Sequence, residues 1–422
     1  MAELPPMSAI TSWSKESPML AKIAFRNIFR NRRRTLITLL VLVMGAAGLI
    51  LFGGYKEMNF WGLRESTIRN RLGHLQLYRK GYLSADSQKP LEYGLEDVAE
   101  VRGAVEKDPR VAMTAAQITF MGLISNGDKS ETFLGTAVEP AKDRQMRSQR
   151  METGRELSDG EMDAMMVGRG LARSMNVKIG DYLTLMTTTV TGSLNAMDFQ
   201  VVGTFMTGVK EYDDRAIKVP LSGAHYLLNT KKIEKLLVML KQTEDTDAVM
   251  ADVKTLAASR NWPIEMRPWS DLAGFYHQVV LIFNGIFGFI GTIVFVIVVL
   301  SVANTIMMNI FERTREIGTL MAIGTKRKRI WALFLLEGAM LGLIGGVLGL
   351  VFGAALGQII NYAQIQLPPP PGYTAGYQLR ILMRPSILVS SFALSIVTAT
   401  LSSIYPAFKA SRLNIVDALG HI

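Results

Sequence analysis

The sequence contains no cysteine, so it offers no disulfide bridge, no zinc–thiolate site and no thiol nucleophile. Histidine is also scarce. The four histidines, His74, His225, His277 and His421, are scattered and lack the close spacing of a metal-binding pair. We therefore expect each of them to be a surface or strand residue rather than a ligand, and we expect no metal site.

Motifs for catalysis are missing as well. A P-loop needs two glycines separated by four residues and followed directly by Lys and then Ser or Thr, because the backbone N–H groups and the lysine contact phosphates. The nearest match, residues 203–211, has Val209 between the second glycine and the lysine and has Glu211 where the hydroxyl residue should stand. No Gly-x-Ser-x-Gly elbow occurs. We expect this chain to have no catalytic residue and no cofactor of its own.

Charged residues are absent or nearly absent from several long runs of the chain. The hydrocarbon core of a bilayer is about 30 Å thick, which takes about 20 helical residues to cross. These runs, of which the third contains Glu337 as its single charged residue, therefore predict four transmembrane helices, at residues 35–54, 277–311, 331–362 and 385–405. A cleaved signal peptide is the competing interpretation of the first run, but its length and the lack of an Ala-x-Ala site after it favour a retained anchor.

Basic residues are concentrated in the segments predicted to lie inside. Residues 1–34 hold seven Lys or Arg against two Glu, and residues 312–330 hold six against two. The tail, residues 406–422, has a net charge of +1. The net charges of these three segments, +5, +4 and +1, sum to the formal net charge of the whole chain, +10. By the positive-inside rule they are cytoplasmic. The high pI thus reflects topology, and we expect no nucleic-acid partner.

Residues 55–276 lie between the first two predicted transmembrane helices and are long enough to form a domain with its own core. Alternation of apolar residues predicts strands at residues 75–78, 182–185 and 199–203. Helical spacing occurs at residues 95–105 and 246–258. The predicted fold class is therefore an α-helical membrane domain of four transmembrane helices plus a large mixed α/β extracytoplasmic domain inserted between helices one and two.

Two segments outside the membrane lack a clear period. Residues 141–163 are polar, and we expect a surface loop or arm there. Residues 363–384 form the second extracytoplasmic loop, in which the prolines at 368–371 predict a stiff spacer.

Two amphipathic segments lie on the predicted inner side. Residues 20–34, within the N-terminal segment 1–34, carry apolar residues on one side and basic residues on the other, which favours an interfacial helix over a simple basic stop-transfer cluster. Residues 312–330 combine a charged rim with helix formers, which a mere linker would not need. The apolar stripe of this second segment consists of Ile317, Leu320, Met321 and Ile323. We interpret it as a coupling helix that a partner holds.

The chain resembles the FtsX/MacB-like permeases of ABC transporters at four places that occur in the same order. These stretches are residues 24–35, 313–324, 336–349 and 405–419. Residues 73–82 make the start of the outer domain most similar in appearance to the lipoprotein-releasing LolC and LolE permeases.

The resemblance implies a permease that pairs with a second copy or a close paralogue on a cytoplasmic ATPase dimer, which binds the ATP and Mg²⁺. We expect that ATPase to be a separate chain, because residues 1–34 are too few to form one. The implied ATPase-coupling residues are Glu312, Arg313, Arg315, Glu316, Ile317, Gly318, Leu320 and Gly324. The implied secondary contacts are Pro406, Lys409 and Arg412. The expected location is the bacterial inner membrane, with the large domain in the periplasm beside a carrier or adaptor protein.

Inside the predicted membrane helices, Glu337 is the sole Asp, Glu, Lys or Arg, which disfavours a conduction path for polar solutes. We expect Glu337 to have a structural role, either pairing with Arg313 or Arg315 or extending to the interface. Glycines in the first and third helices predict close helix contacts. A dimer interface and packing within one chain both remain open for them.

The outer halves of the first two transmembrane helices are uncharged and rich in aromatic residues. They predict an apolar cleft, lined by Leu49, Phe52, Phe283 and Phe287. Such a cleft would suit acyl chains, whose burial is worth about 0.8 kcal/mol per CH2. Plain lipid-facing packing of the same residues remains open.

Three functions remain open from the sequence. The first is ATP-driven extraction or export of a lipophilic substrate, a lipoprotein or a lipid. The others are mechanical control of a periplasmic cell-wall hydrolase and efflux or sensing of antimicrobial peptides or drugs. The residues that would decide among them lie on outer surfaces that the pattern does not place.

Overall fold

The computed structural model describes residues 24–28, 32–84, 90–146, 150–369, 374 and 376–419. The chain divides into two compact units. The helical unit comprises Met1–Phe60, Val280–Gln366 and Gln378–Ile422, and the α/β unit comprises Trp61–Val279 and Leu367–Tyr377. Each unit has a hydrophobic core of its own.

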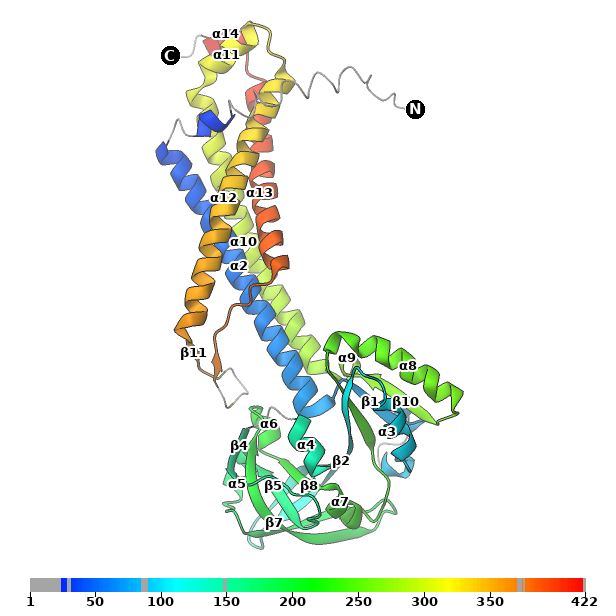
Figure 1. The fold of residues 1–422 in the computed structure, drawn as a ribbon. Helices are drawn as coiled ribbons and strands as arrows, with labels where there is room; N and C mark the ends of the chain where they lie inside the picture. The colour runs from blue at the N-terminus through cyan, green and yellow to red at the C-terminus, as the bar shows by residue number, and fades with distance from the viewer. Residues whose placement is uncertain are drawn as a thin grey trace. The chain divides into compact units, whose positions relative to one another are not determined.

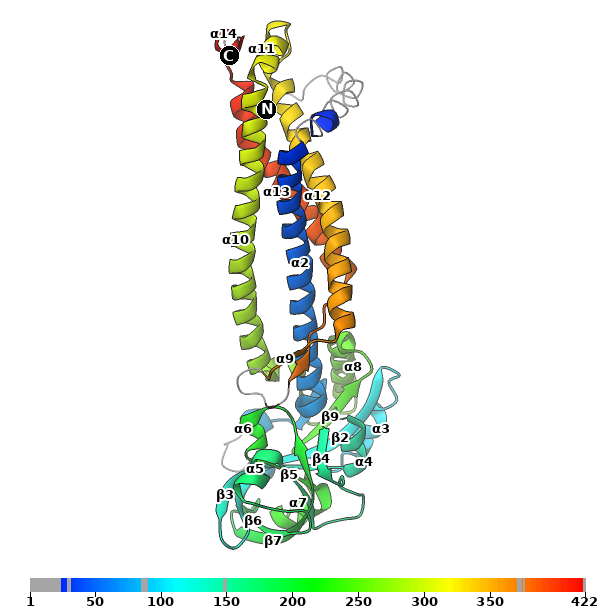
Figure 2. The same cartoon turned by 90° about the vertical axis from the view of Figure 1, so that its left-hand side faces the viewer.

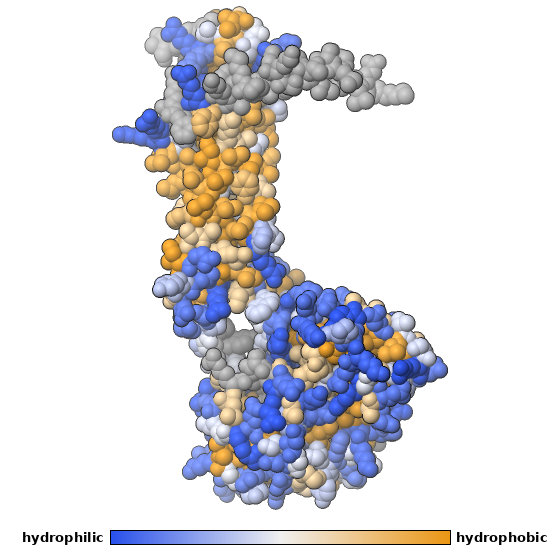
Figure 3. All heavy atoms as spheres, viewed as in Figure 1, coloured by the Kyte–Doolittle hydropathy of each residue, from blue (hydrophilic) through white to orange (hydrophobic). Residues whose placement is uncertain are grey.

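Long apolar helices form the helical unit (Figures 1 and 2). They are α2 (Arg32–Thr67), α10 (Gly274–Glu312), α12 (Arg327–Ala363) and α13 (Pro385–Ser411). In the part of the chain that the structure describes, these four are long and apolar enough to cross a membrane. Their surface is apolar over the middle of the unit (Figure 3). Each transmembrane segment predicted from the sequence lies within one of these helices.

Glycines of α12 bring that helix into close contact with two neighbours. A Cβ atom at Gly338 would lie 2.6 Å from Ser403 Oγ on α13, and one at Gly349 would lie 2.6 Å from Ala46 Cβ on α2. Only residues without a side chain permit this approach. The α12 glycines therefore pack within one chain, which was one of the two alternatives. Gly48 on α2 differs, because a Cβ atom there would meet nothing within 4 Å among the described residues.

The short helices α11 (Thr314–Ala322) and α14 (Ile415–Leu419) also belong to the helical unit. Two two-residue strands, β11 (Gln366–Leu367) and β12 (Tyr377–Gln378), pair with each other. Residues 24–28 are helical, with Ala24 and Ile28 buried. The rest of the predicted interfacial helix before residue 32 lies outside the described residues, as do residues 370–372 of the predicted proline spacer.

The α/β unit is built on a ten-stranded mixed sheet, counted over the described residues. The strand order is β10-β1-β9-β2-β3-β8-β5-β7-β4, and β6 pairs with β2 and β7. The strands are β1 (Leu75–Arg79), β2 (Val111–Ser125), β3 (Ser130–Val138), β4 (Arg150–Gly154), β5 (Ala164–Gly168), β6 (Tyr182–Thr188), β7 (Leu194–Met206), β8 (Ala216–Pro220), β9 (Lys235–Leu240) and β10 (Ile264–Pro268). The predicted α/β class of the inserted segment is confirmed.

Helices and single turns connect these strands. They are the π-helix η1 (Ile68–Leu72), the 3-10 turns η2 (Tyr82–Ser84), η3 (Pro90–Tyr93) and η4 (Thr243–Asp245), and the α-helices α3 (Ala99–Val105), α4 (Pro140–Met146), α5 (Arg169–Ser174), α6 (Lys210–Asp213), α7 (Leu221–Leu228), α8 (Thr246–Ser259) and α9 (Trp269–Leu272).

The segment predicted to be a loop, residues 141–163, has more structure than expected. It contains most of α4 and the whole of β4, which pairs antiparallel with β7. The loop prediction agrees with residues 155–163, which contain no helix or strand, and is wrong at β4, an edge strand that backbone hydrogen bonds join to the sheet. Its side chains are largely exposed, as at Met151 (44%), so they leave no apolar period in the sequence.

Candidate functional site

The charged segment between α10 and α12 forms the short helix α11, which lies beside α14 at one end of the helical unit (Figures 1 and 2). Ile317 and Met321 are buried in the same apolar cluster as Ile330 and Phe334 of α12. Because a residue recurs on the same helix face every three or four positions, this contact fixes which face of α11 remains outside. The outer face carries Arg315.

The other coupling residues surround this apolar contact. Gly318 is buried and Leu320 is half-buried, whereas Ile323 is 75% exposed and does not belong to the buried stripe. Gly324 follows the helix with a φ of 95°, and the N–H of Thr325 donates to the Leu320 carbonyl. A glycine in this left-handed conformation is a common way to end a helix.

Ion pairs hold the charged rim of α11 in place. Glu312 Oε1 lies 2.6 Å from Arg34 Nη1 at the start of α2. Arg313 Nε donates to Glu316 Oε2 at 3.0 Å. No ion pair joins Glu337 to Arg313 or to Arg315 in the described part of the chain.

Glu337 itself is 1% exposed. Its Oε2 atom has no hydrogen-bond partner within the described residues.

The three predicted secondary contacts lie at the end of α13, which continues beyond the predicted membrane segment. Pro406 is buried inside this helix. Lys409 and Arg412 are exposed. The Lys409 ammonium lies 5.4 Å from the centre of the Phe311 ring at the end of α10. Lys409 and Arg412 are therefore accessible to a partner, whereas Pro406 is not.

Three of the four predicted cleft residues meet in an aromatic cluster on α2 and α10. The ring centres of Phe52 and Phe287 are 6.0 Å apart, and those of Phe283 and Phe287 are also 6.0 Å apart. Phe60, which we did not predict, extends the cluster with its ring centre 6.4 Å from Phe283. Phe60 follows Phe52 by eight residues, a spacing that places both on one face of a helix. We did not use this spacing because we expected the helix to end at residue 54.

Leu49, the fourth predicted cleft residue, lies about one helical turn before Phe52 on α2. It lines a small cavity of about 40 Å³ together with Val294 of α10 and Leu394 of α13. Phe52 and Phe283 remain 49% and 38% exposed. Aliphatic side chains beside them are exposed too, among them Ile282 (58%) and Ile286 (49%), so the exposed apolar surface at this part of α10 is both aromatic and aliphatic.

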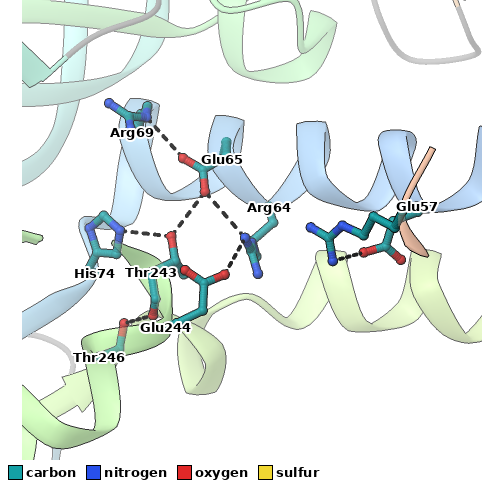
Figure 4. A network of polar contacts seen from close by, with 9 residues as sticks. Glu57, Arg64, Glu65, Arg69, His74, Thr243, Glu244 and Thr246 are labelled. Atoms are coloured by element: carbon teal, nitrogen blue, oxygen red, sulfur yellow. Dashed lines mark hydrogen bonds and ion pairs between the residues drawn. The ribbon is translucent and has the colours of Figure 1, made fainter. Parts of the chain in front are cut away.

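A second polar network, within the α/β unit, was not predicted (Figure 4). His74 is 1% exposed, and its Nδ1 accepts the N–H of Leu240 at 3.1 Å. Its Nε2 then carries the proton and donates to Thr243 Oγ1 at 3.1 Å. Thr243 donates in turn to Glu65 Oε1 at 3.0 Å, and Arg69 Nε lies 3.1 Å from Glu65 Oε2. Burial lowers the pKa of His74 to about 4, so the ring is neutral at physiological pH.

The network fastens the last turns of α2 to η4, which leads into α8. Arg64 of α2 adds a second link between the same two elements, because its Nη2 lies 3.2 Å from Oε1 of Glu244 in η4. Separately, in the helical unit, Glu57 of α2 pairs with Arg384 at 2.7 Å (Figure 4). Neither network has the composition of a metal centre, and the described residues hold no group of three His, Asp or Glu side chains that could bind one.

Two family models match the chain. The model of the MacB-like periplasmic core domain matches residues 35–256. The model of the FtsX-like permease C-terminal region matches residues 288–415. The first alone covers more than half of the sequence.

Relatives of the whole chain are named as ABC transporter permeases. An uncharacterized ABC transporter permease of Methanocaldococcus jannaschii is 25% identical over 94% of this chain and 96% of its own length. The macrolide export ATP-binding/permease protein MacB of Bdellovibrio bacteriovorus is 22% identical over 94% of this chain and 60% of its own length. The chain thus spans about three fifths of that MacB protein. Neither relative confirms the resemblance to the LolC and LolE permeases.

Solved structures give weaker likenesses. The periplasmic region of MacB from Actinobacillus actinomycetemcomitans has a TM-score of 0.35 and 9% identity, covering 49% of this chain and 93% of that one. The extracellular domain of the transporter YknZ from Gram-positive bacteria has a TM-score of 0.34 and 10% identity, covering 46% and 98%.

Proposed function

Because the chain belongs to the MacB-like and FtsX-like permeases of ABC transporters, we propose that it transmits the closure of a cytoplasmic ATPase dimer to its outer domain. The work so transmitted extracts or exports a lipophilic substrate, a lipoprotein or a lipid. The observation that carries the proposal is α11, whose apolar face is sealed against the helical unit while its charged face stays exposed. A helix held in this way moves with the bundle when a partner pushes on it.

The partner surface is defined by charge. Arg315 is exposed on α11, and the basic run at residues 326–329 is exposed directly after it. Lys409 and Arg412 add two cations at the end of α13. Such a cationic surface suits an acidic groove on the ATPase, since complementary charge sets the register of an interface.

We further propose that the chain lies in the bacterial inner membrane with the α/β unit in the periplasm. The ATPase is a separate chain, and a second permease copy or paralogue completes the complex. The permease of Methanocaldococcus jannaschii supports the separate ATPase, because its length is matched almost entirely by this chain. ATP and Mg²⁺ are then held by the partner.

The coupling proposal predicts that the double substitution Arg315→Ala and Glu316→Ala detaches the ATPase. We expect ATPase stimulation by the permease to fall at least tenfold, because Arg315 is exposed on the outer face of α11 and half-buried Glu316 pairs with Arg313 beside it. The measurement is ATP hydrolysis by the reconstituted complex, with co-purification of the two chains as a second readout. The matched control is Arg260→Ala with Glu100→Ala, an exposed pair 3.1 Å apart in the α/β unit. Undiminished stimulation in the first variant would overturn the assignment.

The substrate part of the proposal rests on the aromatic cluster of Phe52, Phe60, Phe283 and Phe287. Half-exposed aromatic rings in a membrane helix offer contact area to acyl chains, whose burial is favourable by about 0.8 kcal/mol per CH2. Macrolide export is the second candidate, and the name of the Bdellovibrio bacteriovorus relative supports it.

A photo-cross-linking residue at Phe283 tests both candidates in cells. We expect adducts with acylated proteins or lipids, whereas a residue at Val389, which is 65% exposed on α13, serves as the lipid-facing control. Adducts at Phe283 that a macrolide displaces would favour the second candidate. Equal adducts at both positions would remove substrate binding from the aromatic cluster.

A further inference from the structure

A cavity lined by both charged and apolar side chains lies in the α/β unit. Its volume is about 190 Å³. The walls come from the π-helix η1, from the strands β2, β3, β8 and β9, and from α4. A π-helix is rare, and where one occurs it is frequently part of a functional site. Here it places Arg69, Asn70 and Arg71 in succession along the wall.

Cations outnumber carboxylates in this cavity. Arg69, Arg71, Lys218 and Lys235 line it, against Glu139 and Asp143. The charge of Glu139 is already offset from outside the cavity, because both of its oxygens accept Arg102 Nη2 at 2.9 Å. The residues that line the cavity carry a formal net charge of +2, from four cations and two carboxylates, and Glu65 and Glu234 offset part of it by pairing with Arg69 and Lys235.

Arg71 is the cation of this cavity that is best placed to bind an anion. It forms no ion pair within the residues that the structure describes, and its guanidinium lies 5.3 Å from the centre of the Tyr212 ring. Stacking on an aromatic ring orients a guanidinium and leaves its N–H groups for another acceptor. Burial raises the pKa of Tyr212, so its hydroxyl keeps its proton and can donate.

Lys218 adds a buried charge to the same cavity. Its side chain is 4% exposed, and its Nζ lies 3.5 Å from Asp143 Oδ1 and 5.3 Å from the centre of the Phe205 ring. Lys235 is adjacent in sequence to Glu234, with which it pairs at 3.2 Å. Lysines held inside a protein need negative charge around them, since an ammonium is costly to remove from water.

The size and the remaining lining restrict the ligand. Pockets that enclose a drug-sized molecule have volumes of about 300–1,000 Å³, so this cavity is too small for a macrolide. A compact anion fits better. Leu72, Leu134 and Leu237 supply apolar wall beside the cations, which suits a ligand with a short organic part next to its charge.

We propose that this cavity binds a phosphate group, either as free phosphate or as the headgroup of an anionic phospholipid. Several cations with many N–H donors match the multiple acceptor oxygens of a phosphate better than the two oxygens of a carboxylate. Occupancy is also connected to α2, because Arg69 lines the cavity and pairs with Glu65 in the network of His74. This phosphate site does not depend on the identity of the proposed substrate.

The test uses the full chain purified in a maltoside detergent, titrated with inorganic phosphate by calorimetry at constant ionic strength. We expect saturable one-to-one binding. Arg71→Gln and Lys235→Gln should each raise Kd at least tenfold. Arg260→Gln is the matched control, because Arg260 is an exposed arginine that also stacks on an aromatic ring, Trp262, at 5.4 Å. It should leave Kd within twofold of the wild-type value.

A second titration with dihexanoyl phosphatidylglycerol, below its micelle concentration, separates the two sources. Binding at least tenfold tighter than that of phosphate, and weakened by the same substitutions, assigns the lipid headgroup. Binding equal to or weaker than that of phosphate assigns a free anion. If Lys235→Gln lowers the melting temperature, its loss of binding could come from unfolding. The result then rests on Arg71→Glu, because Arg71 is exposed and its replacement does not disturb a core. Absence of saturable binding by both probes, or wild-type affinity in Arg71→Glu, would overturn the proposal.

Discussion

At the scale of single residues, buried polar groups show how the end of α2 is held in the α/β unit. Both ring nitrogens of His74 form hydrogen bonds: Nδ1 accepts from the N–H of Leu240, and Nε2 donates to Thr243. The charged groups facing this histidine are Glu65, Arg69, Arg64 and Glu244. Because removal of one partner leaves a buried donor or acceptor unsatisfied, such a chain of hydrogen bonds holds one specific arrangement.

The neutral state of His74 predicts a pH dependence of stability. Its pKa of about 4 lies below the ordinary value of 6.5, so the stabilisation is present above about pH 6.5 and is lost as pH falls toward 4. The loss amounts to up to about 3 kcal/mol in the free energy of unfolding. Melting temperatures of the full chain from pH 7 to 4.5 measure it. His74→Gln should flatten that decline, whereas His277→Gln, at an exposed position, should not. Parallel declines in all three proteins would contradict the assignment.

At the scale of elements, α12 is defined by what its glycines allow. One stripe, which includes Gly338 and Gly342, faces α13, and another, which includes Gly345 and Gly349, faces α2. Glycines four residues apart form one continuous face of a helix. Both faces are occupied by helices of the same chain, so α12 belongs to a tightly packed group of helices.

Two glycine-to-alanine substitutions distinguish packing from helix propensity. Gly349→Ala should destabilise the helical unit by about 1–3 kcal/mol, because the new methyl group would lie 2.6 Å from Ala46 Cβ. Gly288→Ala on α10 meets nothing within 4 Å among the described residues, so the better helix propensity of alanine should stabilise by up to about 1 kcal/mol. Thermal unfolding in detergent compares the two. A Gly349→Ala variant as stable as the wild type would contradict the packing.

At the scale of the whole molecule, the distribution of charge determines the expected orientation. By the positive-inside rule we expect the cationic segments at residues 1–34, 312–330 and 406–422 to lie on the cytoplasmic side and residues 55–276 to lie on the other side. Four membrane crossings bring the chain back to the side on which it began, so the first and last segments are expected on the same side. The position of the α/β domain between α2 and α10 agrees with this count.

Orientation can be measured with single cysteines, because the chain has none of its own. Asp128→Cys, at the exposed turn between β2 and β3, should react with an impermeant maleimide once the outer membrane is permeabilised. Lys328→Cys, in the exposed basic run before α12, should react only after the inner membrane is broken. Protection of residue 128 in the first experiment would refute the four-helix topology.

The sequence by itself determined the features that depend on local patterns. The apolar runs that predict α2, α10, α12 and α13 are visible because a bilayer demands about 20 apolar residues in a row. The strand at Tyr182–Thr188 is visible because one face is buried, which gives a period of two. The strand at Leu75–Arg79 is visible because Leu75 and Leu77 alternate with Gln76 in the sequence, although both of its faces are buried. Membership of the permease family was visible for a related reason, since its motifs are contiguous.

Only the tertiary structure decided contacts between distant parts of the chain. His74 and Thr243 are 169 residues apart, and nothing in either segment indicates the other. Phe60 joins the aromatic cluster because α2 continues to Thr67, beyond the apolar run that the sequence reveals. Lys218 and Arg71 line one cavity only because β8 and η1 meet in the folded unit. Pairings of this kind depend on the packing of whole elements, which short-range periodicity does not encode.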